Sequence, residues 1–298
     1  MNARIAWPAT PPTGSRRRDK TDLRVVSPGI DPDPGPALRG APAVCYRPRV
    51  MGDSVTLARE GAIATVTLNR PDRRNALSDA MLTELGAAFA ELRDDAATRV
   101  LIVTGAPPVF CAGADAPLHS KMTPDERRQA FAQRKSQFRR LFERANTLLE
   151  SLEQTTLAMI NGHAVGGGWG LTLACDFRWA ADEAEFWIPE VDLGVPLGVA
   201  STTRFVRLVG PARAKEIIME CRRYSAADAH AMGLLHRVVP GTSLLKEARA
   251  WVELLAAKPA GPLAEAKARI NAIARTGIPE VNAMTEGFLD RGSDPDDA

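Results

Sequence analysis

Apolar and polar residues alternate regularly along most of this chain. Residues 61–69 place Ala64, Val66 and Leu68 on one face of an extended segment, which predicts a strand. Ser78 precedes a segment whose apolar residues recur at helical spacing: Leu82, Leu85, Phe89 and Leu92. Because a serine hydroxyl can accept a hydrogen bond from a free N–H of the first helical turn, we expect Ser78 to cap this helix.

Short apolar runs and longer amphipathic segments follow. The apolar runs predict strands at residues 99–105, 157–162, 176–181, 185–190 and 236–239. The amphipathic segments predict helices at residues 124–153, 211–221, 225–234, 243–259 and 262–275. Strands therefore dominate the first two-thirds of the predicted fold and helices the last third, which indicates an α/β domain with a helical C-terminal layer.

The first 50 residues show no sustained apolar period. They are rich in proline and contain a basic cluster at residues 16–20. Such a segment cannot bury enough apolar surface to offset the entropy of ordering, so we predict a disordered tail. Met51 opens the patterned part, and we hypothesise that translation starts there. The predicted organisation is a tail at 1–50, a core at 51–240 and C-terminal helices at 241–298.

The composition fits a soluble globular protein and narrows its partners. The 298 residues are 25% charged and 45% hydrophobic, and the net charge of +2 argues against nucleic acid as a partner. No run of 18 apolar residues occurs, so we expect no membrane association. No H-E-x-x-H motif occurs, and we predict no metal site. Four widely spaced cysteines predict free thiols in a reducing compartment, hence a cytoplasmic location: Cys45, Cys111, Cys175 and Cys221.

Residues 158–170, AMINGHAVGGGWG, concentrate five glycines. A dinucleotide-binding G-x-G-x-x-G motif fails here because Leu171 or Leu173 occupies its last glycine position, and a P-loop fails because no lysine follows. Two interpretations remain. The glycines can allow close packing of a strand against a helix, or they can form a strand-to-helix turn whose free N–H groups point at an anion.

Five stretches of the sequence carry motifs in a fixed order. They are TLNRPDRRNALS at 67–78, GAPPVFCAGAD at 105–115, NGHAVGGG at 161–168, PEVDLGVPLG at 189–198 and the segment 210–240. Together they resemble the enoyl-CoA hydratase/isomerase family of the crotonase superfamily, over about residues 52 to 275. The resemblance implies a spiral of repeated β-β-α turns at 51–240, followed by C-terminal helices that build a homotrimer, often paired into a hexamer.

The resemblance also implies the substrate and the site. The substrate would be an acyl-CoA thioester, so coenzyme A arrives as part of the substrate and no bound cofactor is expected. When a proton leaves the carbon beside the thioester carbonyl, an oxyanion forms, and the N–H groups of Ala112 and Gly167 would stabilise it. Substrate and coenzyme A contacts are implied at seven further positions: Arg74, Ala76, Gly113, Ala114, Asp115, Gly166 and Gly198.

One acid of the family's hydratases is missing. Those enzymes use two glutamates, one just after the glycine run and one in the P-E segment. The second is Glu190, whereas the first position is Gly170. The apolar residues before Glu190, which are Phe186, Trp187 and Ile188, predict that its pKa is raised above about 4.3.

One acid suffices to take a proton from one carbon and return it to another, so we predict a one-glutamate enoyl-CoA isomerase with Glu190 as the catalytic residue. Dienoyl-CoA isomerases do not fit, because they carry aspartates at the positions of Gly170 and Gly198. Alternatives are a hydratase whose second acid comes from residues 116–153, another thioester reaction on the same scaffold, and a non-catalytic acyl-CoA binder. Retention of Glu190 argues against the binder.

Overall fold

The computed structural model describes residues 49–50, 52–115 and 123–275. All described residues lie in one compact unit, Val44–Ala298. Most of the predicted tail, and Met51 as the hypothesised start, therefore lie outside the described residues. Arg49 and Val50, which we placed in the tail, instead form a strand that pairs with residues 56–57.

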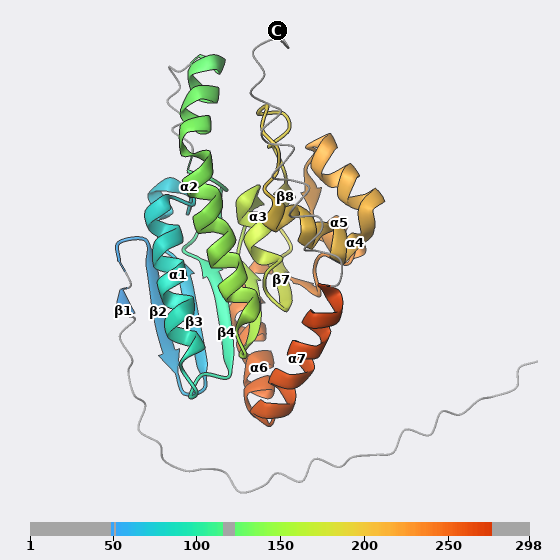
Figure 1. Ribbon diagram of the computed structural model, residues 1–298. Helices are drawn as coiled ribbons and strands as arrows, with labels where there is room; N and C mark the ends of the chain where they lie inside the picture. The colour runs from blue at the N-terminus through green and yellow to red at the C-terminus, as the bar shows by residue number, and fades with distance from the viewer. Residues whose placement is uncertain (1–48, 51, 116–122, 276–298) are drawn as a thin grey trace, which may run out of the picture. The chain divides into compact units, whose positions relative to one another are not determined.

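The described residues form a main sheet of seven strands in the order β1-β2-β3-β4-β5-β7-β10 (Figure 1). β1 and β2 pair antiparallel, as do β2 and β3, whereas the strands from β3 to β10 run parallel. The bounds are β1 Arg49–Val50, β2 Val55–Glu60, β3 Ile63–Leu68, β4 Val100–Gly105, β5 Thr155–Ile160, β7 Phe177–Ala181 and β10 Arg237–Val239.

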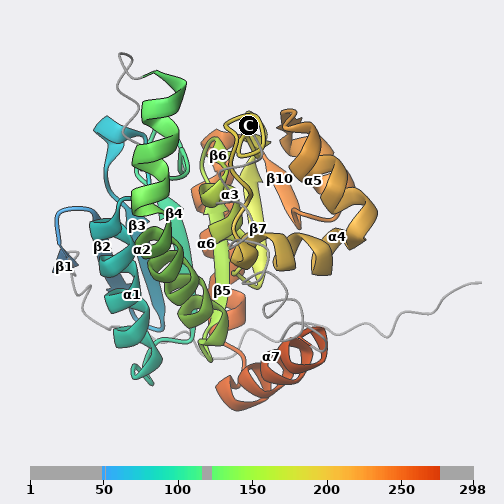
Figure 2. The ribbon, with the colours of Figure 1, turned by 45° about the horizontal axis from the view of Figure 1, so that its top comes forward.

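Helices cover both faces of this sheet (Figures 1 and 2). α1 and α2 lie on one face and α6 on the other. The described helices are α1 Asp79–Arg93, α2 Pro124–Ser151, α3 Gly167–Thr172, α4 Val199–Glu220, α5 Ala226–Ala231, α6 Gly241–Ala256 and α7 Ala260–Ala274, with a 3-10 turn at Pro71–Arg73. Side chains of a strand alternate between faces. Leu101 and Val103 of β4 accordingly belong to the core beneath α1 and α2, while Ile102 packs in a second core against α6.

A smaller sheet of three strands, β6 Ala164–Val165, β8 Glu185–Trp187 and β9 Tyr224–Ser225, lies beside the main one. The units β5-β6-α3 and β7-β8-α4 each contribute one strand to each sheet before a helix. This is the repeated β-β-α turn that we predicted. Isolated bridges join Leu77 to Ala114 and Cys111 to Ala164, so the loops of the expected site continue the small sheet.

Several predicted elements match the structure closely. Ser78 caps α1, and its hydroxyl accepts a hydrogen bond from the N–H of Met81. The helix predicted at 211–221 is instead the second half of α4, which begins at Val199 and is interrupted at Gly210, where φ is +73°. The first half escaped prediction because serine and threonines, which favour helices weakly, occupy residues 201–203. Burial of Ala200, Ser201 and Phe205 on this half fixes the helix.

The two C-terminal helices differ in how they pack. Leu244, Ala248 and Val252 of α6 are buried against the sheet, whereas α7 buries no residue and exposes Ile270 and Ile273. Contacts between subunits would cover such apolar side chains, but the homotrimer or hexamer stays a prediction. In the described part of the chain, no helix combines the length and apolar character needed to cross a membrane.

Candidate active site

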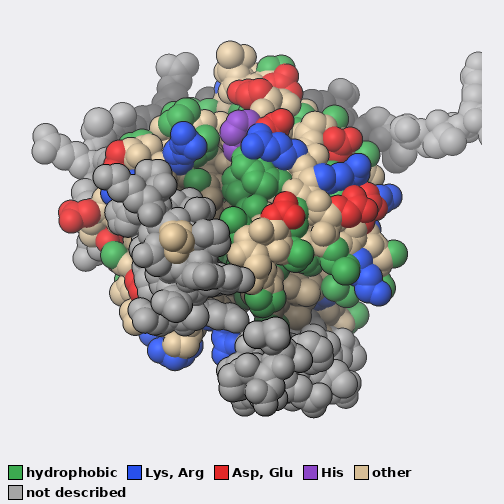
Figure 3. All heavy atoms as spheres, turned by 90° about the horizontal axis from the view of Figure 1, so that it is seen from above, with side chains coloured by type: hydrophobic (Ala, Val, Ile, Leu, Met, Phe, Trp, Pro, Cys, Tyr) green, Lys and Arg blue, Asp and Glu red, His purple; other side chains and the backbone are tan. Residues whose placement is uncertain are grey.

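The four segments of the expected site all follow the carboxyl ends of neighbouring parallel strands. The loop before α1 follows β3, residues 106–115 follow β4, the glycine run follows β5, and β8 with Glu190 follows β7. Ligand sites of parallel sheets lie at this edge. Figure 3 views the protein from this side and shows hydrophobic side chains gathered beside a histidine, with charged side chains around them.

The glycine run forms the turn from β6 into α3. Gly166 has φ +50° and donates its N–H to the carbonyl of Trp187 at 2.9 Å. Gly167 begins α3, so its N–H precedes any acceptor within the helix and finds none elsewhere in the described residues. Both interpretations of the run find support, because the N–H of Gly167 has no partner within the described ranges and Gly168 packs closely on Cys111.

The loop from Cys111 to Asp115 runs alongside this turn. A Cβ on Gly113 would lie 2.8 Å from the carbonyl oxygen of Val165 and 3.8 Å from the nitrogen of Gly167. The expectation that Ala112 is an oxyanion donor conflicts with this geometry, because its N–H donates to the carbonyl of Arg74 at 3.0 Å. That bond ties the loop to the turn before α1 and occupies the donor.

Ala114 is the residue of this loop that can supply a free N–H group in place of Ala112. Its neighbours hold the loop in place, since Gly113 accepts from the N–H of Leu77 at 2.8 Å and Asp115 donates to the carbonyl of Leu77 at 2.9 Å. The N–H of Ala114 itself has no partner among the described residues. The backbone at Gly113, with φ +88°, turns the chain between the two alanines. The motif in the sequence gave both alanines but did not show which N–H was already bonded.

Glu190 follows β8 in a tight turn. Its carbonyl accepts from the N–H groups of Leu193 and Val195, at 3.1 and 2.9 Å, and Gly194 completes the turn with φ +73°. The carboxyl group points at the glycine run: Oε1 lies 2.4 Å from where a Cβ on Gly166 would be. Oε2 is buried and has no hydrogen-bond partner in the described part of the chain.

Burial raises the pKa of Glu190 to about 7, and the backbone N–H of the same residue opposes this shift. Although the residue as a whole is half-buried, its carboxyl tip is enclosed, which explains the large effect. The prediction of a raised pKa therefore agrees in direction and cause. A carboxyl group with a pKa near neutrality can both accept and return a proton.

The pH dependence of turnover follows from this pKa. With Glu190 as the predicted base, only its carboxylate form accepts a proton, so we expect kcat/KM for a proton transfer to rise as the pH increases through about 7 and to level off above it. The folded state favours the protonated carboxyl, so the contribution of Glu190 to stability is present below about pH 4.5 and is lost as the pH rises to about 7. Initial rates measured from pH 5 to 9 test this expectation, and a profile flat between pH 6 and 8 would contradict it.

The residues expected near coenzyme A are held by an arginine that the sequence did not single out. Nη1 of Arg70 donates to the carbonyl of Ala76 at 2.7 Å and lies 2.8 Å from Oδ2 of Asp115. Asp115 therefore joins two loops through an ion pair, in addition to any contact with substrate. Arg74 is exposed, with φ +51°, and its carbonyl is the acceptor for Ala112. Arg70 lies within the matched motif 67–78, but no spacing or charge pattern marked it.

The buried side chain of Asn75 fixes the same loop. Its amide donates to the carbonyls of Ala106 and Val109, at 2.7 and 2.8 Å, and its oxygen accepts from the N–H of Arg70 at 2.9 Å. Asn75 also has φ +54°, a conformation that asparagine tolerates better than most residues. These hydrogen bonds fix the turn between β3 and α1 against the loop that carries Ala114.

The position of the missing acid is filled by other side chains. A Cβ on Gly170 would lie 2.0 Å from Oγ and 2.9 Å from Cβ of Ser201 on α4, and 3.5 Å from the ring of Phe142 on α2. Gly198, expected near the substrate, is exposed at the N-cap of α4, three residues before Ser201. The structure thus brings Gly166, Gly167 and Glu190 together and shows no contact of Gly198 with them.

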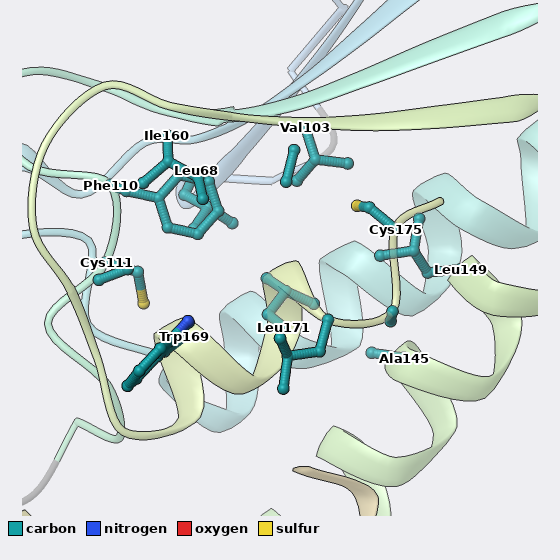
Figure 4. Close-up of a cluster of buried hydrophobic side chains, with 14 of the residues drawn as sticks. Leu68, Val103, Phe110, Cys111, Ala145, Leu149, Ile160, Trp169, Leu171 and Cys175 are labelled. Atoms are coloured by element: carbon teal, nitrogen blue, oxygen red, sulfur yellow. The ribbon is translucent and has the colours of Figure 1, made fainter. Parts of the chain in front are cut away.

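Three other conspicuous side chains have structural surroundings. Nδ1 of His163 accepts from the N–H of Glu185 at 3.1 Å, which fixes its tautomer. Burial raises the pKa of Cys111 to about 12, so its thiol is not a nucleophile. Trp169 lies in the core with Cys111 and Leu171 rather than in a substrate pocket (Figure 4). Among the described residues, no group of three or more histidine, cysteine or acidic side chains is placed to hold a metal ion.

Comparison with known proteins places this geometry in a family. The family model for enoyl-CoA hydratase/isomerase matches residues 58–291. The chain is 36% identical over 198 residues to the crotonyl-CoA hydratase of Syntrophomonas wolfei, which covers 66% of this chain and 73% of that protein.

Solved structures of proteins named as enoyl-CoA hydratases or isomerases have the same fold as this chain. The enoyl-CoA hydratase from Bacillus anthracis superposes with a TM-score of 0.67 at 33% identity, covering 80% of this chain and 90% of that one. A monofunctional enoyl-CoA isomerase from M. smegmatis superposes with a TM-score of 0.63 at 28% identity, covering 76% and 96%. The resemblance and the α/β fold class are confirmed, and the chain belongs to the enoyl-CoA hydratase/isomerase family.

Proposed function

We propose that this protein is an enoyl-CoA isomerase that uses Glu190 as its single proton carrier. The observation that carries the proposal is the enclosed carboxyl of Glu190, with a pKa of about 7, beside a glycine turn whose other acid position is filled by Ser201 and Phe142. The substrate would be a 3-enoyl thioester of coenzyme A, and no further cofactor is required.

The reaction moves one proton and one double bond. The Glu190 carboxylate removes a proton from C2, and the electron pair of that C–H bond forms a dienolate whose charge rests on the thioester oxygen. The protonated Glu190 then returns the proton to C4, so that the double bond moves from C3–C4 to C2–C3. No atom is gained or lost, and Glu190 ends as a carboxylate.

The N–H groups of Ala114 and Gly167 would stabilise the dienolate oxygen. Both are unpartnered in the described residues, and both belong to neighbouring segments, since a Cβ on Gly113 would lie 3.8 Å from the nitrogen of Gly167. Two such fixed donors are worth about 3–4 kcal/mol each in comparable oxyanion holes. This assignment replaces Ala112, whose N–H is bonded to Arg74.

Hydration is the second candidate, because the relatives named above include a crotonyl-CoA hydratase and an enoyl-CoA hydratase. Adding water across a double bond needs a group to hold and activate the water as well as one to protonate the carbon. Position 170 carries no side chain in this chain, so a hydratase would need its second group from elsewhere, such as residues 116–153, or Glu190 would have to do both.

A paired assay on the full chain distinguishes the candidates. One arm follows conversion of a 3-enoyl-CoA to the 2-enoyl-CoA, and the other follows hydration of the 2-enoyl-CoA. We expect isomerisation to exceed hydration by at least about 100-fold, the contribution of one acid–base group. Faster hydration than isomerisation would overturn the proposal. Thermal stabilisation by acyl-CoA without turnover on either substrate would favour the binder instead.

A further inference from the structure

Ser201 lies where a second acid of the site would begin. Its hydroxyl is 2.0 Å, and its Cβ 2.9 Å, from the position that a Cβ on residue 170 would take. We propose that Ser201 is a specificity-determining residue, which excludes a second carboxylate from the site and so commits it to chemistry by Glu190 alone. This inference rests on the proposed function of Glu190.

Position 170 lies close to the part of α3 that Glu190 contacts. Gly166 and Gly170 are four residues apart and are joined by a backbone hydrogen bond of 2.9 Å. Gly166 is the N-cap of α3, with φ +50° and ψ −121°, so the two residues lie about one turn apart at the start of the helix. Glu190 Oε1 faces the first position and Ser201 Oγ the second. A side chain on residue 170 would therefore extend from α3 about one turn after the position that Glu190 covers.

The helix that carries Ser201 is not free to move aside. One turn later, the buried Arg204 pairs with Glu150 of α2 and donates to the carbonyl of Ala200. Arg207 binds the other carboxyl oxygen of Glu150 at 2.6 Å. Rotation of the Ser201 hydroxyl would relieve its own overlap with a side chain at 170, but its Cβ, at 2.9 Å, would still be in conflict.

The hydroxyl of Ser201 has no other visible role in the packing. The residue is 1% exposed, and its Oγ has no hydrogen-bond partner within the described ranges. A buried hydroxyl without a partner is unfavourable, so the hydroxyl adds nothing to the packing, and the Cβ is the part of Ser201 that limits position 170. The hydroxyl and Cβ of Ser201, and the ring of Phe142, border the point from which a side chain at position 170 would extend.

The test compares Gly170→Glu, Ser201→Gly and the double variant with the wild-type chain. We expect Gly170→Glu alone to lower Tm by roughly 4–10 °C, because it overpacks the contact between α3 and α4. In the double variant the Tm will recover by most of this amount, and hydration of 2-enoyl-CoA will exceed the wild-type rate by about 100-fold or more. Ser201→Gly alone will not gain hydration.

Gly170→Glu combined with Ser201→Ala is the matched control. It removes the hydroxyl but keeps the Cβ, so it should recover little of the lost Tm. Equal Tm values for Gly170→Glu and the double variant would overturn the proposal, and so would a folded double variant that hydrates no faster than the wild type. The Tm comparison needs no activity. Failure of the proposed isomerase function, seen as faster hydration by the wild type, is therefore distinguishable from failure of the role of Ser201.

Discussion

Glu190→Gln will lower kcat for isomerisation on the order of 10³-fold or more. A single general acid–base group contributes about 10²–10⁴-fold, and Glu190 would serve both proton transfers. Glutamine has nearly the same shape but accepts no proton under these conditions. Because the carboxyl contacts the glycine turn closely, a substitution of equal size keeps the packing at Gly166. Steady-state kinetics with a 3-enoyl-CoA measure the loss, and KM should change little.

Glu185→Gln is the matched control for this variant. Glu185 lies five residues earlier on β8, and its carboxylate pairs with the exposed Arg223 at 3.0 Å. Surface pairs of this kind contribute little to stability. We expect wild-type kcat for Glu185→Gln. Retention of more than about a tenth of the activity by Glu190→Gln would exclude Glu190 as the proton carrier.

Gly166→Ala will reduce kcat by about 100-fold, which is the effect of misplacing a catalytic group by about 1 Å. The new Cβ would lie 2.4 Å from Oε1 of Glu190, so the carboxyl must move. Alanine is also strained at φ +50°, so some loss of stability accompanies the loss of activity. The pH–rate profile will shift as well, because displacement of the carboxyl changes the burial that sets its pKa.

The strain and the displacement can be measured separately. Gly233 has φ +80°, and no atom lies within 4 Å of the Cβ that an alanine would add there. Gly233→Ala should therefore lose stability by a similar strain, about 1–3 kcal/mol, and keep its kcat. Equal kcat values for Gly166→Ala and Gly233→Ala would show that Gly166 does not position Glu190.

The local elements of the fold could be predicted because their causes are local. The cap at Ser78 and the apolar face of α1 depend on residues within a few positions of one another, and both match the structure. The alternation at residues 63–68 likewise gives the buried face of β3. The first half of α4 could not be predicted in this way, since distant residues hold it in place. One example is the ion pair between its Arg204 and Glu150 of α2.

The features of the site likewise fall into those that the sequence determined and those that depend on the tertiary structure. By itself, the sequence determined the family, the glycine turn, the retained Glu190 and the absence of a side chain at Gly170, because motifs are patterns of residue types in order. The tertiary structure decided which N–H groups are free, since the bond from Ala112 to Arg74 joins residues 38 positions apart. It also decided the pKa of Glu190 and the place of Ser201. Burial and steric contact depend on which distant segments meet, and no local pattern records that.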